Sequence, residues 1–132
     1  MMDAKKKATV KQKPEPARGA RKSKGKRVGV LGAGAWGTAG ARALALNGHD
    51  VTLWAREAEI VESVNKRHEN GMFLPGVRLP DKLRASIEPL DAATGMEAIF
   101  LGVPSPFLLS AVKRILTSTD IMEGRTLIAV LT

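Results

Sequence analysis

The sequence contains no cysteine among its 132 residues, and this absence excludes several kinds of site. Disulfide frameworks, cysteine–zinc sites, iron–sulfur clusters and cysteine nucleophiles all require thiols. Histidine occurs only twice, and no metal-ligand spacing, nucleophile elbow or Ser/His/Asp arrangement is present. We therefore predict neither a metal site nor a catalytic residue in this chain. No uncharged apolar run approaches the roughly 18–20 residues of a membrane span, so no membrane span is expected.

Positive charge is concentrated at the start of the chain, although the whole sequence carries +8. Residues 1–27 contain eleven Lys and Arg against two acids, a net charge of +9, whereas residues 28–132 contain ten against eleven, or −1. The first segment has Val10 as its only large aliphatic residue besides the starting methionines. Such a composition cannot bury enough apolar surface to offset the entropy of ordering. We predict a disordered basic tail over residues 1–26.

Three interpretations of this tail stay open: a solvated arm, an arm that binds a polyanion, or a targeting segment. A secretory signal is not predicted, because no apolar core follows the charges. A transit peptide fits poorly, because the segment is rich in Lys, poor in Ser and lacks an amphipathic stripe. Because the remaining chain is almost neutral, the total charge does not indicate nucleic acid as a partner of the folded part.

Apolar, β-branched runs alternate with helical segments from Arg27 onward. Strands are expected over 27–31, 50–54, 83–87, 98–103 and 125–131, helices over 35–47, 57–70 and 107–116, and a helical turn over 91–96. Gly48 and Gly71 are expected to end helices, and the last helix is expected to open with Ser105 as its N-cap and Pro106 in its first turn. Strands that alternate with helices imply parallel βαβ units. The expected fold class is α/β, a Rossmann-like doubly wound parallel sheet over residues 27–132 behind the tail.

A glycine cluster directly follows the first strand and opens the first helix, in the pattern G-x-G-x-x-G. Gly32 permits a tight turn, Gly34 lets a pyrophosphate approach the backbone, and Gly37 lets helix and strand pack closely. The helix N-terminus would then face the phosphates with free N–H groups. The predicted cofactor-binding residues of this loop are Gly32, Ala33, Gly34, Ala35, Trp36 and Gly37.

The end of the second strand distinguishes NAD from NADP. An acid there hydrogen-bonds the ribose 2′-hydroxyl, whereas a nearby Arg accommodates a 2′-phosphate. Asp50 begins the strand and so lies at the wrong edge, while Arg56 lies at the cofactor edge and points to NADP or to dual use. Glu57, the next residue, is an acid that could hydrogen-bond the ribose 2′-hydroxyl, so NAD stays a second candidate. We expect NADP or NAD as the cofactor.

Four segments resemble the NAD(P)-dependent glycerol-3-phosphate dehydrogenases. They are the loop at 32–39, Asn47 to Arg56, Asn65 with the H-E-N…L-P-G…L-P stretch at 68–80, and the V-P-x-x-F turn from Val103 to Phe107. The glycine loop alone fits many dehydrogenases, but the generic Rossmann fold does not require the 68–80 stretch. The likeness covers residues 27–132.

The resemblance implies an oxidoreductase of glycerophospholipid and carbohydrate metabolism that interconverts dihydroxyacetone phosphate and sn-glycerol 3-phosphate with NAD(P)H, in the cytoplasm. By the same resemblance Trp36 flanks the pyrophosphate and Arg56 lies where the adenosine ribose or its phosphate is recognised. Phe73 falls on an aromatic position near the cofactor, and Pro104 and Phe107 lie towards the nicotinamide side.

Three departures from the family pattern affect these expectations. Gly40 replaces a larger aliphatic residue in the first helix, and the small Ala35 removes a polar contact. More seriously, the family continues beyond the equivalent of Thr132 into a Lys-Gly segment and a helical substrate domain with a second lysine, and this chain contains neither. We therefore expect a truncated chain that binds cofactor without turnover, and substrate binding only together with the missing domain.

A truncated chain is also expected to have an unusual surface. The face that meets the second domain should expose apolar surface, so we expect a marginally stable or self-associating chain. Two other functions stay open: the cofactor domain of a related hydroxy-acid dehydrogenase, and a stand-alone nucleotide-binding module with a polyanion-binding tail. Fold alone does not decide between them.

Overall fold

The computed structural model describes residues 25–131 of the chain, apart from the side chains of 119 and 120. The predicted disordered tail therefore lies almost entirely outside the described residues. Five strands form one sheet: β2 (Arg27–Leu31), β3 (Asp50–Trp54), β4 (Arg84–Ser86), β5 (Ala98–Leu101) and β6 (Leu127–Val130). Their order is β4-β3-β2-β5-β6, and every pair is parallel. The expected Rossmann-like α/β fold is confirmed.

The connections between the strands are mostly helical. They contain α1 (Ala35–Leu46), α2 (Ala58–Glu62), the π-helical turn η3 (Ser63–Arg67), the 3₁₀ turn η4 (Pro89–Ala92), α3 (Ser105–Ile115) and α4 (Thr119–Met122). The short α4 was not expected from the sequence, because four residues are too few to show helical periodicity. Among residues 25–131, none of the helices has the length and hydrophobicity that a bilayer-spanning helix requires.

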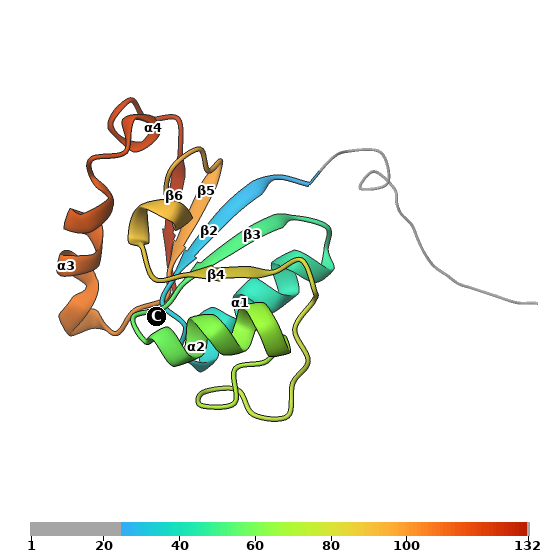
Figure 1. Cartoon of the computed structure of the whole chain (residues 1–132). Coiled ribbons are helices and arrows are strands. Elements are labelled where there is room, and N and C mark those ends of the chain that lie inside the picture. Colours follow the sequence, from blue (N-terminus) through green and yellow to red (C-terminus); the bar gives the residue numbers. More distant parts are fainter. Residues whose placement is uncertain (1–24, 132) are drawn as a thin grey trace, which may run out of the picture.

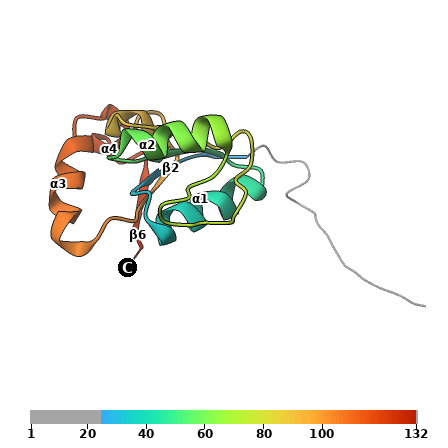
Figure 2. The ribbon, with the colours of Figure 1, turned by 60° about the horizontal axis from the view of Figure 1, so that its bottom comes forward.

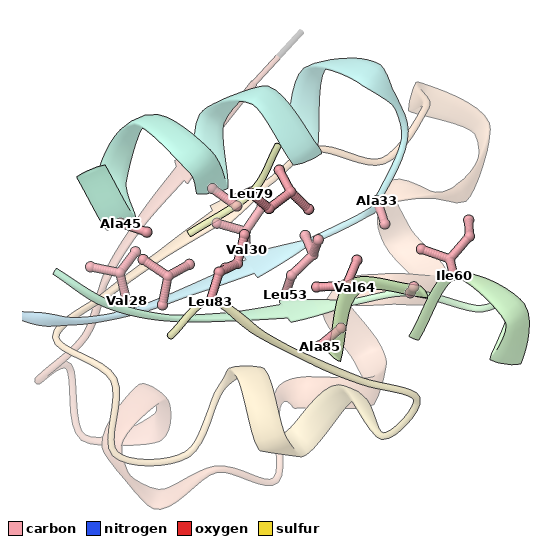
Figure 3. Close-up of a cluster of buried hydrophobic side chains, with 13 residues drawn as sticks. Val28, Val30, Ala33, Ala45, Leu53, Ile60, Val64, Leu79, Leu83 and Ala85 are labelled. Atoms are coloured by element: carbon pink, nitrogen blue, oxygen red, sulfur yellow. The ribbon is translucent and has the colours of Figure 1, made fainter. Parts of the chain in front are cut away.

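The two faces of the sheet bury separate apolar clusters. On one face Val30 of β2 and Leu53 of β3 pack with α1, α2 and the buried Leu79, and Figure 3 shows these side chains gathered between α1 and the strands. On the other face Leu31 and Ile99 pack against α3. In both views of the ribbon α3 and α1 stand at opposite sides of the molecule (Figures 1 and 2). Alternate residues of β2 thus face opposite clusters, as strand geometry requires.

Several helix boundaries differ from the sequence prediction. The turn expected over 91–96 is η4, which begins earlier because Glu88 caps it and Pro89 takes its first position, and α1 and α3 each end one residue before the expected end. Ser105 is not the N-cap of α3: the N-cap is Pro104 in an extended conformation (φ −58°, ψ 146°), Ser105 is the first helical residue, and no side chain caps the helix. The helix expected up to Asn70 ends at Arg67, where His68 adopts a left-handed conformation (φ 56°), so Gly71 is not its terminator.

The strand order reverses between β2 and β5, which makes this the switch point of the sheet. α1 follows β2 onto one face, whereas α3 follows β5 onto the other. The loops that leave the carboxyl ends of β2 and β5 therefore diverge and leave a crevice between them. Ligands of open α/β sheets bind in this crevice.

β6 forms the outer edge of the sheet in the described part of the chain and exposes apolar side chains. Leu127 is 68% exposed, and Ile128 and Val130 are also exposed. The edge strand therefore presents apolar side chains to solvent.

Candidate functional site

The glycine loop is held at the end of β2 by close backbone contacts that exclude side chains. Gly32 has a φ of +112°, and its N–H donates to the carbonyl oxygen of Trp54 at 3.0 Å. A Cβ on Gly32 would lie 2.7 Å from the carbonyl oxygen of Gly102, in the loop after β5. A Cβ on Gly37 would lie 1.8 Å from the carbonyl oxygen of Gly32. Gly32 therefore makes the tight turn and Gly37 the close packing that the pattern predicted.

Gly34 differs from its two neighbours in the motif because a Cβ placed on it would meet nothing within 4 Å. It is the N-cap of α1, where no side chain caps the helix and no acid occupies the first turn. The N-terminal N–H groups of a helix have no intrahelical partners and carry positive partial charge. The glycine therefore keeps open a space towards which the electropositive end of α1 is directed. A pyrophosphate fits these residues, because it needs backbone donors and the absence of a Cβ.

The segment after η3 is tied to the glycine loop by Asn70, which is only 1% exposed. Its Nδ2 donates to the carbonyl oxygen of Ala33 and to Oγ1 of Thr38, each at 2.9 Å. Its Oδ1 accepts a hydrogen bond from the backbone N–H of Phe73 at 3.2 Å. The Asn70 amide thus fixes both the glycine loop and the position of Phe73.

These elements surround one cavity of about 510 Å³, here called the glycine-loop cavity. Nine of the ten predicted cofactor-binding residues line it, and the tenth, Gly37, packs beneath the loop. The nine are Gly32, Ala33, Gly34, Ala35, Trp36, Arg56, Phe73, Pro104 and Phe107. Trp36 is 82% exposed, so its indole flanks the opening rather than packing in the core.

Five further residues line the glycine-loop cavity that the sequence pattern did not indicate. Trp54, Gly102, Val103, Ser105 and Leu131 also line the cavity, together with Glu57. Trp54 and Leu131 end or follow apolar strands, and their sequence pattern indicates burial rather than a ligand. The signal that could have found them is position, because carboxyl-terminal strand ends surround the crevice of an open sheet.

The end of β3 presents a basic side chain to the cavity. Arg56 is exposed, and its Cζ lies 6.0 Å from the centroid of the Phe107 ring, a cation–π arrangement. Glu57, the next residue, is half-buried and caps α2 without a side-chain hydrogen bond. Both residues that could distinguish NADP from NAD therefore lie at this cavity. No group of His, Cys, Asp and Glu suited to a metal occurs within residues 25–131.

Comparison with known proteins identifies the family of the chain. The family described as the N-terminus of NAD-dependent glycerol-3-phosphate dehydrogenase matches residues 27–131. A glycerol-3-phosphate dehydrogenase [NAD(P)+] of Stenotrophomonas maltophilia is 48% identical over 79 residues, which are 60% of this chain and 23% of that protein. The chain thus spans about a quarter of the length of such curated relatives.

Solved structures agree with this assignment. The glycerol-3-phosphate dehydrogenase of Coxiella burnetii matches with a TM-score of 0.72 and 31% identity, over 80% of this chain and 32% of that one. The yeast glycerol-3-phosphate dehydrogenase from Saccharomyces cerevisiae matches with a TM-score of 0.71 and 26% identity, over 82% and 33%. The chain belongs to the family of NAD-dependent glycerol-3-phosphate dehydrogenases, and it corresponds to their N-terminal part.

Proposed function

We propose that the chain binds a nicotinamide dinucleotide, NADP(H) or NAD(H), in the glycine-loop cavity. The observation that carries the proposal is the open space above Gly34, at the uncapped N-terminus of α1, within a cavity of about 510 Å³. The loop N–H groups would hold the pyrophosphate, while Trp36, Phe73, Pro104 and Phe107 would flank the rest of the cofactor. Residues 27–132 form the binding domain in this proposal, and residues 1–26 form a tail.

The family supports a wider proposal for the complete enzyme. We expect the dinucleotide-binding part described here to serve an enzyme that interconverts dihydroxyacetone phosphate and sn-glycerol 3-phosphate. A bound nicotinamide supplies the hydride, and the protein supplies binding and orientation. We expect residues 27–132 by themselves to bind the cofactor without turnover, because the lysines that the resemblance assigns to the substrate lie outside this part of the family's sequence. Mixing the chain with NADPH and dihydroxyacetone phosphate tests this, and NADPH oxidation would contradict it.

Calorimetric titration with NADPH and NADH tests binding directly. The Gly34→Ala variant should lose at least about tenfold in affinity, because its methyl group would displace phosphate oxygens from hydrogen-bonding distance. Gly71→Ala is the matched control: a Cβ there also meets nothing within 4 Å, and Gly71 does not line the cavity. Equal binding by both variants, or no binding by a folded wild-type chain, would overturn the proposal.

Self-association through β6 is a separate part of the proposal. The unpaired edge of a strand offers backbone donors and acceptors to another strand, and the exposed Leu127, Ile128 and Val130 add apolar surface. Two copies that pair at this edge would bury these backbone groups together with the three apolar side chains. Sedimentation velocity at several concentrations measures this, and a monomer at all of them would contradict the proposal.

A cytoplasmic location completes the proposal. A chain without cysteine needs no oxidising compartment to fold. Cell fractionation with an antibody to the chain tests the location, and recovery in the membrane fraction would contradict it.

A further inference from the structure

A second cavity of about 530 Å³ adjoins the glycine-loop cavity and is here called the side cavity. The two cavities share five lining residues, namely Trp54, Arg56, Val103, Pro104 and Phe107. The side cavity adds Ile87 beyond β4 and Ser110, Ala111 and Arg114 of α3. It therefore extends the crevice outward from the end of β3 along the side of α3.

The apolar walls of the side cavity suit a flat ring. Trp54 is buried at its base, and its Nε1 donates to the carbonyl oxygen of Ile87 at 2.9 Å. This bond fixes the segment after β4 against the end of β3. Ile87 and Phe107 are each about half-exposed, although both are large apolar side chains. Exposed apolar walls over a fixed aromatic base bury a planar heterocycle such as adenine favourably.

Two guanidinium groups from different elements lie at this cavity. Arg56 follows β3, and Arg114 lies in the last turn of α3. Among residues 25–131, neither makes an ion pair or a hydrogen bond, and none of the nine lining residues is acidic. Glu57, whose carboxylate could accept a hydrogen bond from a ribose 2′-hydroxyl, lines the glycine-loop cavity but not the side cavity. The side cavity therefore carries two uncompensated positive charges.

We propose that the side cavity holds the adenosine 2′-phosphate of NADP(H) between Arg56 and Arg114, so that Arg114 is a second specificity-determining residue. This rests on the proposed dinucleotide function. The cofactor pyrophosphate belongs at the N-terminus of α1, where no Arg114 contact is needed. The other anionic group of NADP(H) is the 2′-phosphate, and this is the group that Arg56 and Arg114 would bind. Guanidinium groups bind phosphate through paired N–H donors, and an isolated lysine would not replace them. NADP(H) is then the preferred cofactor over NAD(H).

The test uses the chain of 132 residues with 2′,5′-ADP and 5′-AMP, which differ only in the 2′-phosphate. Calorimetry should show 2′,5′-ADP binding at least about tenfold tighter, since a charge-assisted phosphate contact contributes at least that factor. Arg114→Gln should weaken 2′,5′-ADP binding by about tenfold and leave 5′-AMP binding unchanged. Lys113→Gln is the matched control, because Lys113 is the adjacent exposed cation and does not line the side cavity.

The outcomes separate this inference from the proposed function. Equal affinity of the wild type for the two nucleotides would overturn the inference, as would equal losses in Arg114→Gln and Lys113→Gln. NADPH and NADH that bind equally well would preserve the proposed function and overturn the 2′-phosphate site. Failure of both dinucleotides to bind a chain with a cooperative thermal transition would overturn the proposed function itself, and this inference with it.

Discussion

Asn70 donates a hydrogen bond from its side-chain Nδ2 to the carbonyl oxygen of Ala33 over 2.9 Å, and this bond joins the 68–80 segment to the glycine loop. Leu79, at the far end of the segment, is fully buried, and its N–H donates to the carbonyl oxygen of His68 at 2.8 Å. The segment is therefore fastened at both ends. Its middle, which contains Phe73, is held over the glycine-loop cavity.

Asn70→Ala should destabilise the protein and weaken cofactor binding together. The variant leaves the Ala33 carbonyl and the Thr38 hydroxyl without this donor in a buried site, a change worth about 2–3 kcal/mol in unfolding free energy. Urea unfolding measures the first effect, and NADPH titration under native conditions measures the second.

Asn65→Ala provides the matched control for Asn70. Asn65 also bonds a backbone through both ends of its amide, with Nδ2 to the Ala85 carbonyl oxygen at 2.9 Å and Oδ1 from the Ala85 N–H at 2.8 Å. Ala85 belongs to β4 and does not line the glycine-loop cavity. Asn65→Ala should lower stability without changing NADPH affinity in the folded fraction. If both variants leave NADPH affinity unchanged, Asn70 has only a structural role.

Gly37→Ala should lower the free energy of unfolding by at least about 2 kcal/mol, because the new methyl group would overlap the carbonyl oxygen of Gly32. Gly34→Ala should stay within about 1 kcal/mol of the wild type, since its Cβ enters open space. Chemical denaturation of both variants gives the comparison. Equal free energies of unfolding for the two variants would contradict this, because they would show that α1 moves away from the loop at no cost in stability.

Gly40→Ala should raise the free energy of unfolding by about 0.5–1 kcal/mol, because alanine favours a helix interior more than glycine does. The added Cβ would contact Cδ1 of Leu131 at 3.8 Å, an ordinary van der Waals distance. Ala43→Gly, at an exposed position of the same helix, should lower stability by a similar amount. A destabilised Gly40→Ala variant would indicate that α1 lies closer to its neighbours than this contact shows.

Ile128→Lys should weaken the proposed self-association by at least about tenfold, because it removes an apolar side chain from the edge and adds a charge. Leu46→Lys serves as the control, since Leu46 is 60% exposed at the end of α1, away from β6. Sedimentation velocity should show dissociation only in the first variant. The same behaviour in both would assign the association to general surface hydrophobicity.

The sequence pattern predicted the glycine loop well, because each glycine meets a steric requirement of its immediate surroundings. The G-x-G-x-x-G spacing indicates these requirements without knowledge of the rest of the fold. The role of Asn70 could not be derived in this way. Its partners Ala33 and Thr38 lie far away in the chain, and the amide becomes useful only after Arg67 ends the helix early. The left-handed turn at His68 redirects the chain towards the loop, and no glycine marks it.

The edge strand β6 is a second feature that the sequence predicts only in part. Residues 125–131 form an apolar run that predicts a strand, and β6 occupies most of it. The run does not show that Leu127 and Val130 stay exposed, because exposure depends on what packs beside the strand. The predicted N-cap at Ser105 was wrong for a related reason, since the proline before it already takes the extended conformation of a cap.

The crevice between β2 and β5 also determines when the binding site can exist during folding. β2 pairs with β5 although β3, α2 and β4 lie between them in the chain, so the contact of Gly32 with Gly102 closes a long loop. Contacts of such large sequence separation form slowly, because the entropy of loop closure precedes their stabilisation. An intermediate that contains only β2, α1 and β3 would have the glycine motif but no opposite wall. In a refolding experiment, cofactor fluorescence should therefore follow the last cooperative phase, whereas helical circular dichroism should begin to recover before it.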